Sequence, residues 1–142
     1  MKLQIYQVDA FASELFKGNP AGVCITDSAL EESLMLAIAA EMAVSETAFL
    51  SLDTMQLKWF TPKVEVKLCG HGTLAVAHVL KSNGMYQCGD SIAFNTLSGV
   101  LTAELNSDSI DLSFPAAELD FTVDPDEDII RLLGLSESDI VD

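Results

Sequence analysis

The sequence has few basic residues, and this scarcity argues against several classes of partner. Of its 142 residues only 7 are Lys or Arg, against 22 Asp or Glu, so the formal net charge is −15. Nucleic-acid binding depends on clustered Lys and Arg opposite the phosphates, so we expect no nucleic-acid partner. An anionic membrane surface is disfavoured for the same electrostatic reason.

Long apolar runs are missing, and cysteine is scarce. No run reaches the ~18 residues of a membrane span, and the chain reaches Asp9 too early for a secretory signal peptide. The three cysteines, Cys24, Cys69 and Cys88, have no metal-binding spacing and leave one thiol unpaired. This pattern is typical of reduced thiols in the cytosol, so we expect a cytoplasmic protein without a metal site.

Apolar residues alternate or recur in patterns that predict an α+β fold. An amphipathic helix, capped by Asp27 or Ser28, carries apolar residues at a spacing of four; these are Leu30, Leu34, Ile38 and Met42. Short runs of alternating polarity predict strands at 3–8, 23–25, 47–50, 56–60, 64–68, 91–96, 100–105 and 110–114. We expect a curved, mixed and mostly antiparallel sheet wrapped around a buried central helix.

That central helix is predicted from about Thr73 to Ser82, with Gly84 as its stop. Residues 74–80 are apolar on nearly every side, and a helix without a polar face must be buried. His78 lies among these apolar residues, so we expect it to be a hydrogen-bonded core histidine.

A change of composition near residue 117 predicts a domain boundary. We expect residues 1–117 to form one domain, and residues 118–142 to form an acidic linker and the start of a further unit. Within this tail, 127–133 predicts a short helix that ends at Gly134. The chain ends as a strand begins, so we expect a truncated half of a larger fold.

The turn Cys69-Gly70-His71-Gly72-Thr73 carries the strongest chemical signal. It opens onto the buried helix, whose free N–H groups and positive dipole end favour a carboxylate or an oxyanion. The glycines let a ligand approach the backbone closely. Phosphate loops and flavin or nicotinamide fingerprints are absent from the sequence, so we expect chemistry without a cofactor.

Five motifs, in order over the first ~115 residues, resemble the phenazine-biosynthesis isomerase (PhzF-like) family. They are Val8-Asp9-Ala10-Phe11, Gly18-Asn19-Pro20-Ala21, residues 41–49, the run from Trp59-Phe60-Thr61-Pro62 to Glu65-Val66, and residues 68–73. The resemblance implies half of a diaminopimelate-epimerase-like fold, in which two similar halves enclose the active site. It covers the N-terminal half only, so we expect the single chain to be incomplete as a catalyst.

The resemblance also implies roles for individual residues. Glu46 corresponds to the acid/base group that moves a proton between carbons of a small carboxylate-bearing substrate. His71 corresponds to a histidine lining the same cleft. Candidate substrate-binding residues are Asn19, through its side-chain amide, and the turn residues Gly70, Gly72 and Thr73.

Two alternatives stay open at this point. Cys69-Gly70-His71-Gly72 also resembles the first-thiol motif of proline racemases and diaminopimelate epimerases, so Cys69 is an alternative catalytic thiol. A non-catalytic half-domain is the other alternative. A half-fold exposes the apolar face that its partner half would cover, so we expect a homodimer.

Overall fold

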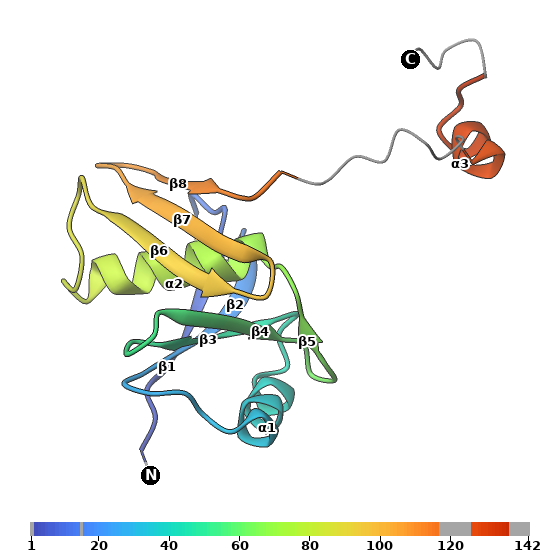
Figure 1. Ribbon diagram of the computed structural model, residues 1–142. Coiled ribbons are helices and arrows are strands. Elements are labelled where there is room, and N and C mark those ends of the chain that lie inside the picture. The colour runs from blue at the N-terminus through green and yellow to red at the C-terminus, as the bar shows by residue number, and fades with distance from the viewer. Residues whose placement is uncertain (1, 15, 117–125, 137–142) are drawn as a thin grey trace.

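The computed structural model describes residues 2–14, 16–116 and 126–136 (Figure 1). In chain order the elements are β1 (Ile5–Ala10), β2 (Asn19–Thr26), α1 (Glu32–Met42), β3 (Thr47–Ser51), β4 (Gln56–Phe60), β5 (Glu65–Val66), α2 (Gly70–Ser82), β6 (Ser91–Thr96), β7 (Gly99–Leu105), β8 (Ile110–Ser113) and α3 (Glu127–Leu132). The predicted α+β class is confirmed.

One curled sheet contains all the described strands. Its order is β1-β2-β3-β4-β6-β7-β8, and β5 pairs with β4 at the side of this path. Neighbouring strands are antiparallel except for two parallel pairs, β2–β3 and β4–β6. Figure 1 shows the sheet curving around α2, as the sequence predicts for a mixed sheet wrapped on a central helix.

The main core lies between α2 and the inner face of the sheet. Val76 and Leu80 of α2 are fully buried there, in one cluster with buried side chains from β2, β3, β4, β6 and β7. The largest of these are Trp59, Phe94, Leu50, Leu57, Ile92, Leu101 and Leu105. Small residues on the helix, such as Ala75 and Ala77, let it sit close to the strands.

A second, smaller cluster lies under α1. Met35 and Ala39 of that helix are buried with Cys24, Phe49 and Phe60. The rings of Phe49 and Phe60 meet edge to face, with centroids 5.7 Å apart. The helix on this side explains why β3 is buried along its whole length, whereas most outer strands alternate.

The helix α1 differs in two ways from its prediction. It begins at Glu32, after a loop in which the Asp27 carbonyl accepts a hydrogen bond from the Asp53 amide (3.1 Å), so neither Asp27 nor Ser28 caps it. Its most buried residues are Met35 and Ala39. The apolar residues of the predicted stripe are only partly buried; these are Leu30, Leu34, Ile38 and Met42.

The central helix α2 has one open face, which the sequence did not predict. Val76 and Val79 are buried as expected, but Leu74 is only half-buried and His78 is exposed. The His78 ring lies 3.3 Å from the Ser82 hydroxyl rather than within the core. The prediction of a core histidine is therefore wrong, because the sheet leaves this side of the helix uncovered.

Other boundaries moved by a few residues. The strand expected at 23–25 begins at Asn19, because it pairs along its length with β1. The strand expected at 64–68 shrinks to two residues, and α2 begins three residues early, at Gly70. The predicted boundary near residue 117 lies outside the described residues. The tail helix α3 is present, and its start is capped by the Asp126 carboxylate.

No helix within the described residues is long and apolar enough to cross a bilayer.

Because the sheet encloses α2, shortening a side chain on the buried face of this helix should strongly lower the stability of the protein. Leu80→Ala should lower the free energy of unfolding by about 2–5 kcal/mol, because a fully buried leucine leaves a cavity. Leu97→Ala is the matched control, since that side chain is 65% exposed. Denaturant unfolding measures both, and similar losses from the two variants would contradict the described core.

Candidate active site

Glu46 is held at the start of a buried strand. The helix α1 ends at Met42, and its C-cap residue Ala43 has a left-handed backbone (φ 53°) that turns the chain toward β3. Three residues later, the Glu46 carbonyl accepts a hydrogen bond from the Gly22 amide (3.1 Å) on β2. The backbone of Glu46 is therefore tied to the sheet, while its side chain stays partly accessible, at 23%.

Cys69 and His71 come from the first turn of α2. Cys69 occupies the N-cap position in extended conformation (φ −148°), and Thr73 closes this turn. The Thr73 amide donates to the Cys69 carbonyl (3.1 Å), and the Thr73 hydroxyl donates to the same oxygen (2.7 Å). These bonds fix the direction in which the Cys69 and His71 side chains leave the helix.

The two segments meet in a line of close contacts. His71 Nε2 lies 3.4 Å from Glu46 Oε2 and 3.3 Å from Ser45 Oγ, while His71 Nδ1 lies 3.4 Å from Cys69 Sγ. We call Glu46, Cys69 and His71 the acid/base cluster. Its carboxylate, thiol and imidazole form a set that can pass a proton and that can also ligate a metal ion.

Close packing beside Trp59 sets the position of the cluster. A Cβ at Gly72 would lie 2.9 Å from Trp59 Cδ1 and 3.0 Å from Cys69 Sγ, so only glycine fits without displacement. Trp59 is 1% exposed, and its Nε1 has no hydrogen-bond partner within the described part of the chain. The buried indole therefore forms the surface against which the turn with Gly72 and Cys69 packs.

Burial keeps the Cys69 thiol protonated. It raises the pKa of Cys69 from 9.0 to about 11, a shift to which the Glu46 charge adds and which a hydrogen bond from the Gly72 backbone opposes. A protonated thiol is a weak hydrogen-bond donor and a poor base. In this state Cys69 does not accept a proton, which leaves the Glu46 carboxylate as the candidate acceptor of the cluster.

The expected substrate-binding residues occupy different surroundings. Thr73 is fully buried and its hydroxyl is used within the helix turn, while Gly72 faces Trp59 and Cys69. Gly70 is partly accessible at the start of α2. Asn19 is exposed in β2, opposite Ala10, and no described hydrogen bond joins it to the acid/base cluster. Their contact with a substrate stays a prediction.

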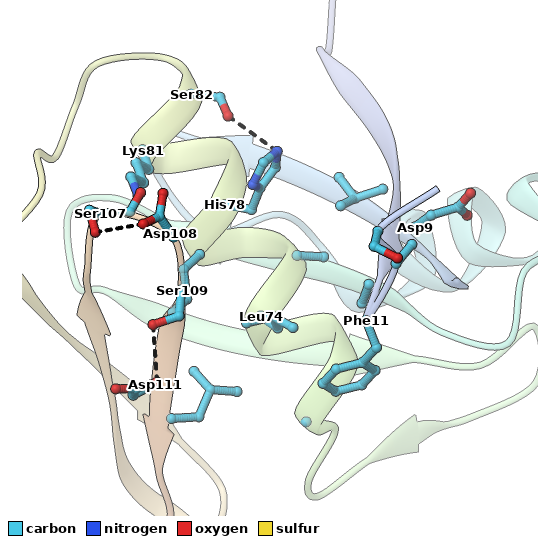
Figure 2. Close-up of a pocket in the computed structure, with 18 of the residues that line it drawn as sticks. Asp9, Phe11, Leu74, His78, Lys81, Ser82, Ser107, Asp108, Ser109 and Asp111 are labelled. Carbon is cyan, nitrogen blue, oxygen red and sulfur yellow. Dashed lines mark hydrogen bonds between the residues drawn. The ribbon is translucent and has the colours of Figure 1, made fainter. Parts of the chain in front are cut away.

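A groove of about 1230 Å³ runs along the open face of α2 (Figure 2). Gly70, Leu74 and His78, one from each turn of the helix, form its floor. One wall is the end of β1 with the following loop, and the other is β8 with its turn. Gly70 is the groove residue next in sequence to Cys69 and His71, but Glu46, Cys69 and His71 themselves are not among the residues that line the groove.

Comparison with known proteins identifies the family. The profile of the phenazine biosynthesis-like protein family (PhzC-PhzF) matches residues 8–134. The chain belongs to this family. The resemblance drawn from the five sequence motifs is thereby confirmed.

Several members of the phenazine biosynthesis-like family are closely similar in sequence. An uncharacterized isomerase of Halalkalibacterium halodurans is 46% identical over 120 residues, covering 83% of this chain and 45% of the relative. An uncharacterized isomerase of Pseudomonas aeruginosa is 42% identical over 143 residues, covering 99% of this chain and 54% of the relative. The chain thus spans about half the length of the curated relatives it matches.

Solved structures agree with the fold. A PhzF-family phenazine biosynthesis protein of Enterococcus faecalis superposes with a TM-score of 0.72 at 42% identity, over 78% of this chain and 43% of that one. A hydroxyproline epimerase of Agrobacterium vitis superposes with a TM-score of 0.56 at 13% identity, over 78% of this chain and 40% of that one, and so shares the fold alone. Both support the predicted epimerase-like half-fold.

Two residues that contact the site, Ser45 and Trp59, were not predicted as site residues from the sequence. Ser45 contacts the His71 ring, and its only sequence signal is its place beside Glu46. Trp59 was noted within a motif, but its position behind Gly72 depends on how β4 meets α2. The sequence predicted no metal site, yet the structure brings together three side chains of metal-ligand type, Glu46, Cys69 and His71.

The raised pKa of Cys69 predicts a characteristic alkylation profile. At pH 8 iodoacetamide should modify exposed Cys88 rapidly and Cys69 slowly, and the rate at Cys69 should climb as the pH rises toward about 11. Mass spectrometry of digested protein, with Cys88→Ser as the control, measures each site. Fast modification of Cys69 at neutral pH would contradict a buried, protonated thiol.

Proposed function

We propose that this chain supplies the acid/base half of a cofactor-independent isomerase, which moves a proton between two carbons of a small carboxylate-bearing substrate. The single observation that carries this proposal is the contact between Glu46 and His71 at the start of α2. Support also comes from the family membership and from relatives that are named isomerases.

Glu46 acts as the proton carrier in this proposal. Its carboxylate removes a proton from one substrate carbon and returns it to another, so no proton is gained or lost overall. The His71 ring, held between Glu46 and Cys69, orients the carboxylate. The backbone hydrogen bond from Gly22 fixes the point from which the Glu46 side chain leaves the sheet, and the contact with His71 Nε2 (3.4 Å) positions its carboxylate.

The substrate carboxylate needs local stabilisation, because the protein as a whole is strongly anionic. The first residues of α2 provide it, since the start of a helix presents free N–H groups and a positive dipole end. Gly70 is the accessible residue of that turn and lines the groove. A substrate whose carboxylate is held at Gly70 must extend beyond the groove to reach Glu46, which does not line it.

A thiol-based epimerase is the second candidate, because Cys69 touches His71 (3.4 Å). In that mechanism Cys69 as thiolate removes the proton. The raised pKa of Cys69 weighs against it, since the thiol of the resting protein stays protonated.

Isotope exchange tests the proposal across a range of candidate substrates. The protein is incubated in D₂O with a panel of small cyclic carboxylic acids, and deuterium at carbon is followed by NMR. Glu46→Gln should lower the exchange rate by about 10²–10⁴-fold, because the amide keeps the shape but cannot carry the proton. His71→Asn should have a smaller effect.

The controls separate the two mechanisms. Glu41→Gln removes an exposed carboxylate at the end of α1 and should leave exchange unchanged. Exchange that survives Glu46→Gln but is lost in Cys69→Ser would replace the carboxylate mechanism with the thiol one. Exchange that survives both variants would exclude the cluster as the site of proton transfer.

We propose that the chain forms a homodimer in which the partner copy covers the groove. Phe11 (73% exposed) and Phe114 (42% exposed) border the groove and offer apolar area for a partner copy. The charge of −15 on each copy opposes association, so the dimer fraction at micromolar concentration should rise with salt. Sedimentation equilibrium measures this, and a single-chain mass at all salt concentrations would contradict it.

A further inference from the structure

The acid/base cluster has the composition of a transition-metal site. Glu46, Cys69 and His71 each offer one ligand atom, and these atoms lie within 4.8 Å of one another. A thiolate sulfur, an imidazole nitrogen and a carboxylate oxygen are the three donor types that Zn²⁺ accepts in proteins. Three protein ligands with one open position are the usual arrangement of an accessible zinc site.

The spacing of sulfur and nitrogen fits such an ion. With Zn–S of about 2.3 Å and Zn–N of about 2.0 Å, tetrahedral ligands lie about 3.5 Å apart. The distance between Cys69 Sγ and His71 Nδ1 is 3.4 Å, so these two atoms need hardly move. The turn that positions them is held by the two hydrogen bonds from Thr73.

The second imidazole nitrogen already has the outer partner that a ligating histidine requires. His71 Nε2 faces both Glu46 Oε2 (3.4 Å) and Ser45 Oγ (3.3 Å). When the Glu46 carboxylate turns toward the metal, the Ser45 hydroxyl remains to accept the Nε2–H bond. A bond of this kind fixes the tautomer that presents Nδ1 to the ion.

We propose that this cluster binds Zn²⁺ through Cys69 Sγ, His71 Nδ1 and a Glu46 carboxylate oxygen, with Ser45 as the outer partner of His71. Binding replaces water ligands of the hydrated ion by Cys69 Sγ, His71 Nδ1 and a Glu46 oxygen, and the thiol proton leaves to solvent, so no redox change is involved. The same three side chains carry the proposed proton transfer, and an occupied site therefore blocks it. The binding itself does not depend on that function.

Cobalt titration tests the site directly, in a Cys88→Ser background that removes the exposed thiol. Co²⁺ should produce the intense near-ultraviolet band of a thiolate–cobalt bond, and added Zn²⁺ should bleach it by displacement. Cys69→Ser should abolish the band. Glu46→Gln and Ser45→Ala should each weaken binding by about 10-fold or more, the loss typical of a broken ligand or outer-partner contact.

Matched variants make the result decisive. Glu41→Gln should bind like the parent, and His71→Asn, which keeps the thiol, should weaken binding with an unchanged circular dichroism spectrum. A band that persists in Cys69→Ser would place the metal on Cys24 instead and overturn the proposal. Absence of a band in the parent, or equal affinity of Glu46→Gln and Glu41→Gln, would overturn it as well.

Discussion

The contact between Gly72 and the Trp59 ring is the constraint on which the rest of the site depends. A helix can enter a curled sheet this closely only where a residue has no side chain. Because α2 begins at that point, its first turn projects Cys69 and His71 toward the start of β3, where Glu46 lies. The packing of the core and the geometry of the site therefore depend on the same contact, so a substitution that changes one also disturbs the other.

Much of the fold could be predicted because its signals are local. The predicted strand 56–60 has its observed limits, and those at 91–96, 100–105 and 110–114 agree within a residue, since alternating burial on a one-sided sheet leaves a clear period of two. The cluster of Glu46, His71 and Cys69 could be anticipated only through family motifs, since no local pattern relates residue 46 to residue 71. Ser45 was missed for the same reason.

Features that depend on the strand path could not be predicted. Whether His78 is covered depends on how far the sheet curls, and the helix pattern carries no information about that. The apolar stripe of α1 was displaced because Phe49 and Phe60, from two different strands, determine which side of that helix is buried. In both cases the tertiary partner, rather than the periodicity, decided the outcome.

The parallel pairing of β4 with β6 has a consequence for how the protein assembles. All of α2 lies between these strands in the chain, so their pairing closes a long loop around the helix. Closing that loop costs more entropy than closing the short turns of the β3–β4 and β6–β7 pairs, so we expect these two pairs to form before β4 meets β6.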